Sequence, residues 1–298
     1  MSPAATSVDV GGRTLQLSNL DKVLWPATGF TKGQMIDYYA RIAPVMLPHL
    51  AGRPITLRRW PNGVEAGSFF EKNCPSHRPD WMPTIGQGGV GYCQLEEPAA
   101  LVWTANLAAV ELHPTLASAP DLEQPRSVVF DLDPGPPADL VTCARVARLL
   151  RALLDRLGLA AWPKTSGSKG LQLYVPLNTP TGYDRTRAFA LGLARVVEQA
   201  HPDLVVTTQD RSVRPGKVLI DWSQNHPTKT TVSVYSLRAW MTPSTSTPVT
   251  WDEIDDAARR EDTERLRFSP EEVLQRVEDR GDLMAPVLEL EQEVPDLG

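Results

Sequence analysis

Long apolar runs, a leader segment and paired cysteines are all missing from this 298-residue sequence. No apolar run approaches the roughly 20 residues of a membrane-spanning helix, and the opening MSPAATSVDVGG does not place a charged segment before an apolar one. The three cysteines, Cys74, Cys93 and Cys143, are odd in number, scattered and outside any CxxC spacing. These absences argue against a membrane span, a secretion signal, a disulfide framework and a zinc site. They predict a reduced, cytoplasmic setting.

The net charge of −6 is unevenly distributed. Residues 250–298 hold 16 acidic and 6 basic residues, whereas the preceding 249 residues hold 20 acidic and 24 basic ones. Residues 1–60 are more basic still, with 7 basic and 3 acidic residues. This asymmetry is compatible with a basic working face and an acidic tail. The negative total therefore does not exclude a nucleic-acid partner.

The spacing of apolar residues predicts an α+β chain. Helices are expected over residues 31–50, 101–114, 138–159, 186–200, 251–266 and 270–279. Strands are expected over 55–60, 127–133, 171–177, 203–208, 217–223 and 230–236, with a hairpin around Gly11-Gly12. Because strands come in pairs between helices, the sheet should be mostly antiparallel with helices on one face.

A shift in composition near residues 115–125 suggests how the chain is divided. We expect an N-terminal α/β module over residues 1–120. A sheet-based module should follow over residues 121–250, and an acidic helical tail over residues 251–298.

The segment SVVFDLDPG ends an apolar run with two carboxylates, Asp131 and Asp133. Residues i and i+2 of a strand point to the same face, roughly 6–7 Å apart. Two carboxylates at this distance repel each other unless a cation lies between them or one is protonated. They are either ligands for Mg²⁺ or Mn²⁺, or a solvated aspartate followed by the first residue of an Asp-Pro-Gly turn.

Two further stretches fit phosphoryl chemistry, although each also has a structural explanation. Asp221 ends the apolar run Val218-Leu219-Ile220, as a third metal ligand or as an aspartate that caps a turn. The segment SGSKG at residues 166–170 leads into a strand, so it is not a Walker A loop. Its backbone N–H groups and lysine could form an anion nest, or it could be an ordinary hairpin turn.

The remaining candidates lie in the first half of the chain. His113 is expected at a helix C-terminus, where a structural role is the simpler interpretation. Phe69 and Phe70 are either core residues or a stacking platform for bases. Of Arg58 and Arg59, alternation along a strand exposes one.

Together these stretches resemble the polymerase domain of the bacterial ligase D type, within the archaeo-eukaryotic primase superfamily. The motifs that carry the resemblance occur in order over residues 17–238: LSNLDKVLWPATGFTKGQMIDYY, GRPITLRRWPNG, FFEKN, WTANLAAVELH, VVFDLDPG, KTSGSKGLQLYVPL, GKVLIDWSQN and KTTVSVYSLR. The resemblance implies a primase-type α+β fold with a mostly antiparallel, RRM-like catalytic sheet and a smaller N-terminal α/β module.

The resemblance also implies roles for individual residues. A catalytic, metal-binding triad would consist of Asp131, Asp133 and Asp221, and would use two divalent ions, Mn²⁺ or Mg²⁺. Nucleotide binding would involve His113, Ser166, Gly167, Lys169, Gln172, Gln224, Arg238, Arg58 and Phe70. DNA binding would involve Asn19, Lys22, Lys32, Arg59, Phe69 and Arg214, with the first three holding a 5′-phosphate.

The implied activity is template-directed extension of primers at DNA gaps or breaks, with a preference for ribonucleotides. The implied partners are gapped or broken DNA with a 5′-phosphate, NTP or dNTP, Ku and a separate DNA ligase, in the cytoplasm at the nucleoid. No ligase or nuclease domain follows, so we expect a stand-alone member or an excised domain.

Two departures from the family pattern keep alternatives open. Gln172 stands where the family usually has histidine, and glutamine cannot carry a charge. The stretch between Trp81 and Trp103 is shorter and less basic than the loop that bridges DNA ends in the family, which favours local gap filling. The alternatives are a DNA-end-binding scaffold with impaired catalysis and a primase that needs no primer.

Overall fold

A computed structural model describes residues 5–296 of the chain, and contacts within it define two units. The first unit contains residues 5–115, 232–246 and 268–282, and the second contains residues 116–231, 247–267 and 283–296. The three-part division expected from the sequence differs from this one, because parts of the expected sheet-based module and of the acidic tail belong with the N-terminal residues.

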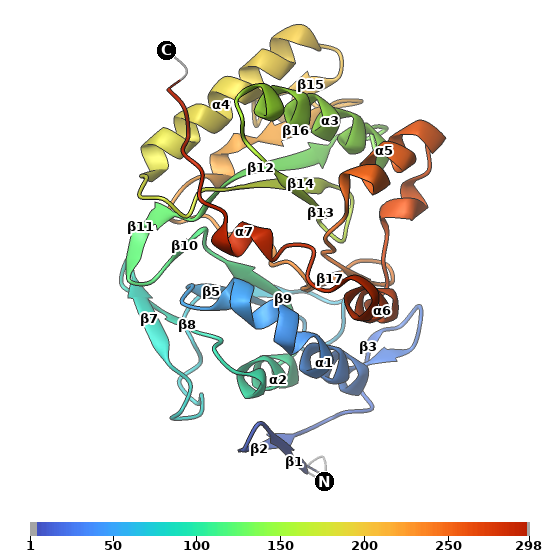
Figure 1. The fold of residues 1–298 in the computed structure, drawn as a ribbon. Helices are drawn as coiled ribbons and strands as arrows, with labels where there is room; N and C mark the ends of the chain where they lie inside the picture. Colours follow the sequence, from blue (N-terminus) through green and yellow to red (C-terminus); the bar gives the residue numbers. More distant parts are fainter. Residues whose placement is uncertain (1–4, 297–298) are drawn as a thin grey trace. The chain divides into compact units, whose positions relative to one another are not determined.

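The first unit is built on an antiparallel sheet (Figure 1). Strand β5 (Ile55–Arg59) pairs with β6 (Phe69–Glu71), with β9 (Ala109–Pro114) and, through one residue pair, with β8 (Val90–Cys93), which in turn pairs with β7 (Thr84–Gln87). Two-stranded pairs are formed by β1 (Thr6–Val10) with β2 (Arg13–Leu17), β3 (Val23–Trp25) with β4 (Phe30–Thr31), and β17 (Leu237–Ala239) with β18 (Pro243–Thr245). Its helices are α1 (Lys32–Leu50), α2 (Pro98–Asn106) and α6 (Pro270–Arg280).

Helix α1 begins where the sequence places a capping signal. The hydroxyl of Thr31 accepts from the N–H of Gln34, and the Gln34 side chain accepts from the N–H of Thr31, which satisfies two N–H groups that a helix start leaves unpaired. Met35, Tyr39 and Ile42 are among the buried residues of one stripe of the helix. The helix and the β1–β2 hairpin confirm the sequence predictions for these segments.

The second unit is built on a five-stranded sheet in the order β13-β14-β12-β16-β15. The strands are β12 (Ser127–Pro134), β13 (Trp162–Thr165), β14 (Leu171–Pro176), β15 (Val205–Val206) and β16 (Val218–Asp221). Only the β15–β16 pair of this sheet is parallel. Helices α3 (Leu140–Arg156) and α4 (Tyr183–Ala200) lie on the same side of the sheet (Figure 1). The predicted α+β class and mostly antiparallel sheet are confirmed.

The rest of the second unit consists of short elements. These are β10 (Ala117–Ser118), β11 (Asp121–Pro125), α5 (Trp251–Arg260), α7 (Pro286–Glu289) and the 3-10 turns η1 (Arg211–Val213), η2 (Trp222–Gln224) and η3 (Thr263–Leu266). The last segment is anchored to the unit: Gln292 bonds the backbone of Ala160 and Pro176, and Asn178 donates to the carbonyls of Val287 and Leu290.

The predicted helix over residues 101–114 is wrong beyond Asn106. Helix α2 ends there, Ala108 adopts a left-handed φ of 58°, and residues 109–114 form the buried strand β9. Glu111 and His113 both lie on this strand, and both are buried. His113 therefore lies within a strand and not at a helix C-terminus.

Three smaller predictions also need correction. The predicted strand over residues 230–236 is irregular backbone, in which Tyr235 has a φ of 65°. The predicted strand over residues 203–208 shortens to Val205–Val206. The helix expected over residues 251–266 breaks at Glu261, whose φ of 57° ends α5 before η3 begins.

The expectation of no disulfide is also wrong, because Cys74 and Cys93 are joined. Cys74 follows β6, and its N–H donates to the carbonyl of Gly91 on β8, which places the two Cα atoms 4.8 Å apart. Sequence spacing gave no sign of this pairing, because the proximity arises from sheet contacts between distant segments. Cys143 is a free, buried thiol. Within residues 5–296, no helix combines the length and apolarity needed to cross a bilayer.

Candidate functional site

Three aspartates share one face of the sheet in the second unit. Asp131 and Asp133 are two residues apart on β12, and Asp131 is directly opposite Asp221 on β16. Because opposed residues of an antiparallel pair and residues i and i+2 of a strand point to the same face, the three carboxylates lie on one side. The pattern SVVFDLD predicted this arrangement for the first two.

Protein donors hold two of these carboxylates. Asp131 Oδ1 accepts from Gln172 Nε2 at 3.2 Å. Asp221 accepts from the amides of Gln209 and Gln224 at 2.9 and 2.8 Å, and from the hydroxyl of Ser223 at 2.6 Å. Gln172 and Gln224 thus lie beside the aspartates, as the sequence analysis expected of nucleotide-binding residues near a metal site.

The third carboxylate is more open. The side chain of Asp133 is 47% exposed and forms an ion pair with Arg214 at 3.2 Å. In the part of the chain that the structure describes, no three His, Cys, Asp or Glu side chains are arranged as metal ligands. The aspartates are turned toward protein donors.

A row of polar side chains crosses the sheet at Asp131. In register, Lys164 on β13 is opposite Gln172 on β14, Gln172 is opposite Asp131, and Asp131 is opposite Asp221. Lys164 is fully buried, with its ammonium 5.6 Å from the centre of the Tyr174 ring. Sequence reasoning did not single out Lys164, although pairing across the SGSKG hairpin places it opposite Gln172.

The pKa of Asp131 shows that negative charge is in excess here. Burial first, and then the neighbouring Asp133 and Asp221, raise this pKa from 3.8 to about 7, against the opposing effects of Gln172 and Lys164. A divalent cation would relieve this repulsion, and carboxylate oxygens are the ligands that Mg²⁺ and Mn²⁺ accept. The residues present therefore fit a divalent ion.

Without divalent ions, replacing Asp131 by asparagine should stabilise the protein more at pH 8 than at pH 5. The folded pKa of about 7 lies above the unfolded value of 3.8, so the folded state binds more protons in this window and stability falls as pH rises. Melting temperatures in EDTA should show the gap between Asp131→Asn and wild type widening by roughly 4 °C or more. A gap that stays constant with pH would contradict the assignment. Asp203→Asn, at an exposed position of the same unit, is the control and should show no such widening.

The segment at residues 166–170 is the hairpin turn between β13 and β14. Ser166 N–H donates to the carbonyl of Gly170 at 2.8 Å, and its hydroxyl accepts from the N–H groups of Ser168 and Gly170 at 3.3 and 3.1 Å. Gly167 has a φ of 72°, and the side chain of Lys169 is exposed. The segment is thus a hairpin turn, one of the two alternatives from the sequence, and its lysine is exposed.

Gly170 permits the close approach of this turn to β12. A Cβ at this position would lie 2.3 Å from the carbonyl oxygen of Leu132, between the two aspartates of β12. Gly170→Ala should therefore force the strands apart and lower the free energy of unfolding by about 1–3 kcal/mol in urea titrations. Gly67→Ala, at an exposed position outside helices and strands where a Cβ meets nothing within 4 Å, should change it by less than about 0.5 kcal/mol. Equal unfolding midpoints for both variants would show that the backbone yields without cost.

A second cluster lies on the sheet of the first unit, around Glu111 on β9. Arg58 on β5 is opposite both Phe70 on β6 and Glu111. Glu111 Oε2 lies 2.9 Å from His113 Nε2 and 3.4 Å from Arg58 Nη1, and Oε1 lies 3.5 Å from Arg238 Nε. Three predicted nucleotide-binding residues are thus brought together by a glutamate that sequence reasoning missed, and a fourth, Phe70, lies against Arg58. The position of Glu111 in the apolar run AAVEL was the available signal.

The charges of this cluster are strongly coupled. Burial alone would raise the pKa of Glu111, but the hydrogen bond to His113 and the charges of Arg238 and Arg58 outweigh it and lower this pKa from 4.5 to about 2. Burial lowers the pKa of His113, against the opposing effect of Glu111. At neutral pH the cluster therefore contains an ionised carboxylate, a neutral imidazole and two guanidinium groups.

The two phenylalanines are exposed rather than buried in the core. Phe69 and Phe70 are 46% and 57% exposed, and each carries a guanidinium over its ring, Arg59 at 5.3 Å and Arg58 at 4.9 Å. Arg59 also pairs with Glu71 at 2.7 Å. Exposed rings backed by cations suit stacking against bases.

The predicted 5′-phosphate residues are close together in the first unit. Asn19 has a φ of 55° and accepts, through its carbonyl, from the N–H of Lys22, and the N–H of Lys32 donates to the carbonyl of Lys22. The ammonium groups donate to backbone carbonyls, Lys22 to Pro61 and Lys32 to Ser18, each at 2.6 Å. Burial, and then the charge of Lys22, lower the pKa of Lys32 from 10.5 to about 8.

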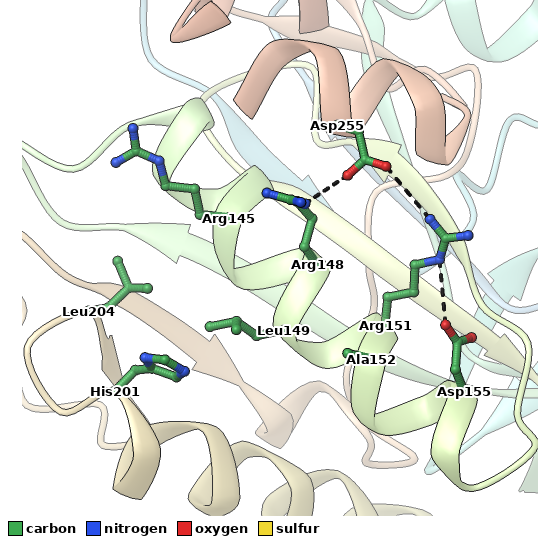
Figure 2. A pocket seen from close by; sticks show the side chains of 9 residues that line it. All are labelled: Arg145, Arg148, Leu149, Arg151, Ala152, Asp155, His201, Leu204 and Asp255. Carbon is green, nitrogen blue, oxygen red and sulfur yellow. Dashed lines mark ion pairs between the residues drawn. The ribbon is translucent and has the colours of Figure 1, made fainter. Parts of the chain in front are cut away.

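The outer surface of α3 forms a hollow lined by arginines (Figure 2). Arg148 and Arg151 both turn toward Asp255, and Arg151 also turns toward Asp155. Because these cations are compensated by acidic neighbours, we assign the hollow no part in the site.

Comparison with known sequences and structures identifies relatives that match most of the chain. A family profile described as "LigD, primase-polymerase domain" matches residues 31–284. The multifunctional non-homologous end joining protein LigD of Mycolicibacterium smegmatis is 44% identical over 279 residues, which are 92% of this chain and 36% of that protein. The bifunctional non-homologous end joining protein LigD of Bacillus subtilis is 31% identical over 268 residues, 90% of this chain and 43% of that protein. The chain thus spans about two fifths or less of the length of these relatives.

The fold has a solved counterpart of similar extent. The polymerase domain of Mycobacterium tuberculosis ligase D, in complex with DNA, matches with a TM-score of 0.84 and 42% identity. The match covers 92% of this chain and 98% of that one. The resemblance seen in the sequence is confirmed: the chain belongs to the LigD primase-polymerase domain family.

Proposed function

We propose that this chain is a template-directed nucleotidyltransferase that extends primers at gaps or breaks in DNA during end-joining repair and prefers ribonucleotides. The observation that carries the proposal is the set of three carboxylates on one face of β12 and β16, with the pKa of Asp131 raised to about 7. Such an excess of negative charge at a strand end destabilises the folded chain, but it would bind the cations that phosphoryl transfer uses.

Asp131, Asp133 and Asp221 would hold two divalent ions, Mg²⁺ or Mn²⁺. When bound, the ions supply activation of the primer 3′-oxygen and neutralisation of pyrophosphate charge. The chain supplies the framework: Gln172, Gln209 and Gln224 orient the carboxylates through hydrogen bonds. Positioning of this kind accounts for most of the rate enhancement in phosphoryl transfer.

Nucleotide recognition would use the predicted nucleotide-binding residues. We assign the triphosphate to Ser166, Gly167, Lys169, Gln224 and Arg238, and the base and sugar to Phe70, Arg58 and His113. Phe69, Arg59 and Arg214 would contact the DNA. Exposed aromatic rings, guanidinium groups and an exposed lysine are the chemistry that nucleotides and nucleic-acid backbones require.

Asn19, Lys22 and Lys32 would hold the 5′-phosphate on the far side of a gap. The ammonium groups of Lys22 and Lys32 donate to backbone carbonyls. Because a carbonyl does not neutralise the positive charge, that charge is available to a phosphate. Gapped or broken DNA with a 5′-phosphate, NTP or dNTP, Ku and a separate ligase are the proposed partners, in the cytoplasm at the nucleoid.

Gln172 favours a second candidate, a DNA-end-binding scaffold with impaired catalysis. The amide is 3% exposed and already donates to Asp131, so it offers no charge to a triphosphate. Extension of a labelled primer across a short gap, with Mn²⁺ and ribonucleotides and with or without a 5′-phosphate, separates the two. Extension supports the polymerase, DNA binding without extension supports the scaffold, and product without a primer indicates priming.

A further inference from the structure

Glu111 lies behind its charged neighbours and does not meet the solvent. Its side chain is 2% exposed, whereas those of Arg58 and Arg238 are 31% and 18% exposed. A ligand at this surface would therefore meet the guanidinium groups and not the carboxylate. Whatever Glu111 does for a ligand, it does through other residues.

Both carboxylate oxygens of Glu111 have protein partners. Oε2 contacts His113 and Arg58, and Oε1 forms an ion pair with Arg238 at 3.5 Å and accepts from the backbone N–H of Ala239 at 3.2 Å. The bond to Ala239 fixes strand β17, which carries Arg238, against β9. One carboxylate thus fixes a strand, two guanidinium groups and an imidazole.

The hydrogen bond between Glu111 and His113 also fixes the tautomer of the His113 ring. Because the pKa of His113 is lowered, the ring is neutral and has one N–H. An ionised carboxylate 2.9 Å from Nε2 can only accept, so the proton is on Nε2, and Nδ1 is left as a hydrogen-bond acceptor. An acceptor beside two cations and the exposed ring of Phe70 suits a ligand with a hydroxyl, phosphates and an aromatic base.

We propose that Glu111 is a positioning residue for nucleotide binding, acting through the tautomer of His113 and the orientation of Arg58 and Arg238. This inference rests on the nucleotide-binding function proposed above. A positioning role and a purely electrostatic role predict opposite changes in triphosphate affinity when the charge of Glu111 is removed. Removing a negative charge beside an anion site would by itself tighten the binding of a triphosphate, whereas loss of positioning weakens it.

The test measures the KM for a ribonucleotide in gap extension by Glu111→Gln, with Glu278→Gln as the control. Glu278 lies on α6 of the same unit and is exposed. We expect KM to rise at least tenfold in Glu111→Gln and to stay within twofold of wild type in the control. KM does not depend on the fraction of protein that is folded, so a structural defect alone would lower only the maximal rate.

Glu111→Asp keeps the negative charge and is the test variant to use if Glu111→Gln does not fold. Its carboxylate is one methylene shorter and cannot serve His113 and both arginines together, so we expect KM to rise at least threefold. Glu111→Gln combined with His113→Ala should raise KM no more than the larger single effect, because both act through one contact. An unchanged or lower KM in Glu111→Gln, or additive effects in the double variant, would overturn the inference. Lack of extension by the wild type would instead refute the proposed polymerase.

Discussion

Asp133→Ala should lower nucleotide incorporation at least about 1000-fold while gapped DNA still binds. Asp133 is the most exposed of the three carboxylates, and its partner is the guanidinium of Arg214. Its loss would remove one ligand from a divalent-ion site, and a factor of 1000 corresponds to about 4 kcal/mol of transition-state stabilisation. Single-turnover extension with Mn²⁺ measures the loss. Fluorescence anisotropy with labelled gapped DNA measures binding.

The controls for this prediction separate charge from fold. Asp133→Asn keeps the shape of the side chain and should be nearly as inactive as the alanine variant, since a neutral amide is a poor ligand for Mg²⁺ or Mn²⁺. Asp203→Asn makes the same chemical change at an exposed position of the same unit and should retain wild-type activity. Extension by Asp133→Ala at the wild-type rate would remove Asp133 from the catalytic set.

The sequence predicted strands β12, β14 and β16 of the second unit because their signals are local, but it missed β13 and made β15 too long. The alternation and the length of apolar runs locate β12, β14 and α3, and the Asp139–Thr142 capping pair marks the start of α3. The placement of the aspartates needs only the two-residue period of a strand plus the pairing of Asp131 with Asp221. The period is readable from one segment. The pairing is not, and the resemblance supplied it.

The first unit was harder to predict because its buried polar residues are compensated by charged residues that are distant in the sequence. Glu111 and His113 alternate with apolar residues along β9, but the segment follows helix α2 almost directly and was predicted as its continuation. Their burial is possible only because Arg58 on β5 and Arg238 on β17 pair with Glu111. Both arginines are more than 50 residues away, one in each direction along the chain. A pattern limited to neighbouring residues cannot detect such compensation. The Cys74–Cys93 disulfide was missed for the same reason.

Lys22→Ala should abolish most of the preference for a 5′-phosphate over a 5′-hydroxyl at a gap. The Lys22 ammonium donates to the carbonyl of Pro61, a neutral group that leaves the positive charge uncompensated. A charge-assisted hydrogen bond contributes about 1.5–3 kcal/mol, so affinity for phosphorylated DNA should fall roughly 10- to 100-fold. Affinity for the hydroxyl form should stay within twofold. Competition binding at low salt measures both.

Lys217→Ala is the matched control, because Lys217 Nζ donates to the carbonyl of Pro202 at 2.7 Å, a contact of the same kind in the second unit. It should leave the ratio of the two affinities unchanged. The wild-type ratio should also decline as pH rises above about 8, because the pKa of Lys32 lies there and its neutral amine no longer attracts a phosphate dianion. A ratio unaffected by Lys22→Ala and constant from pH 7 to pH 10 would mean that the 5′-phosphate is held elsewhere.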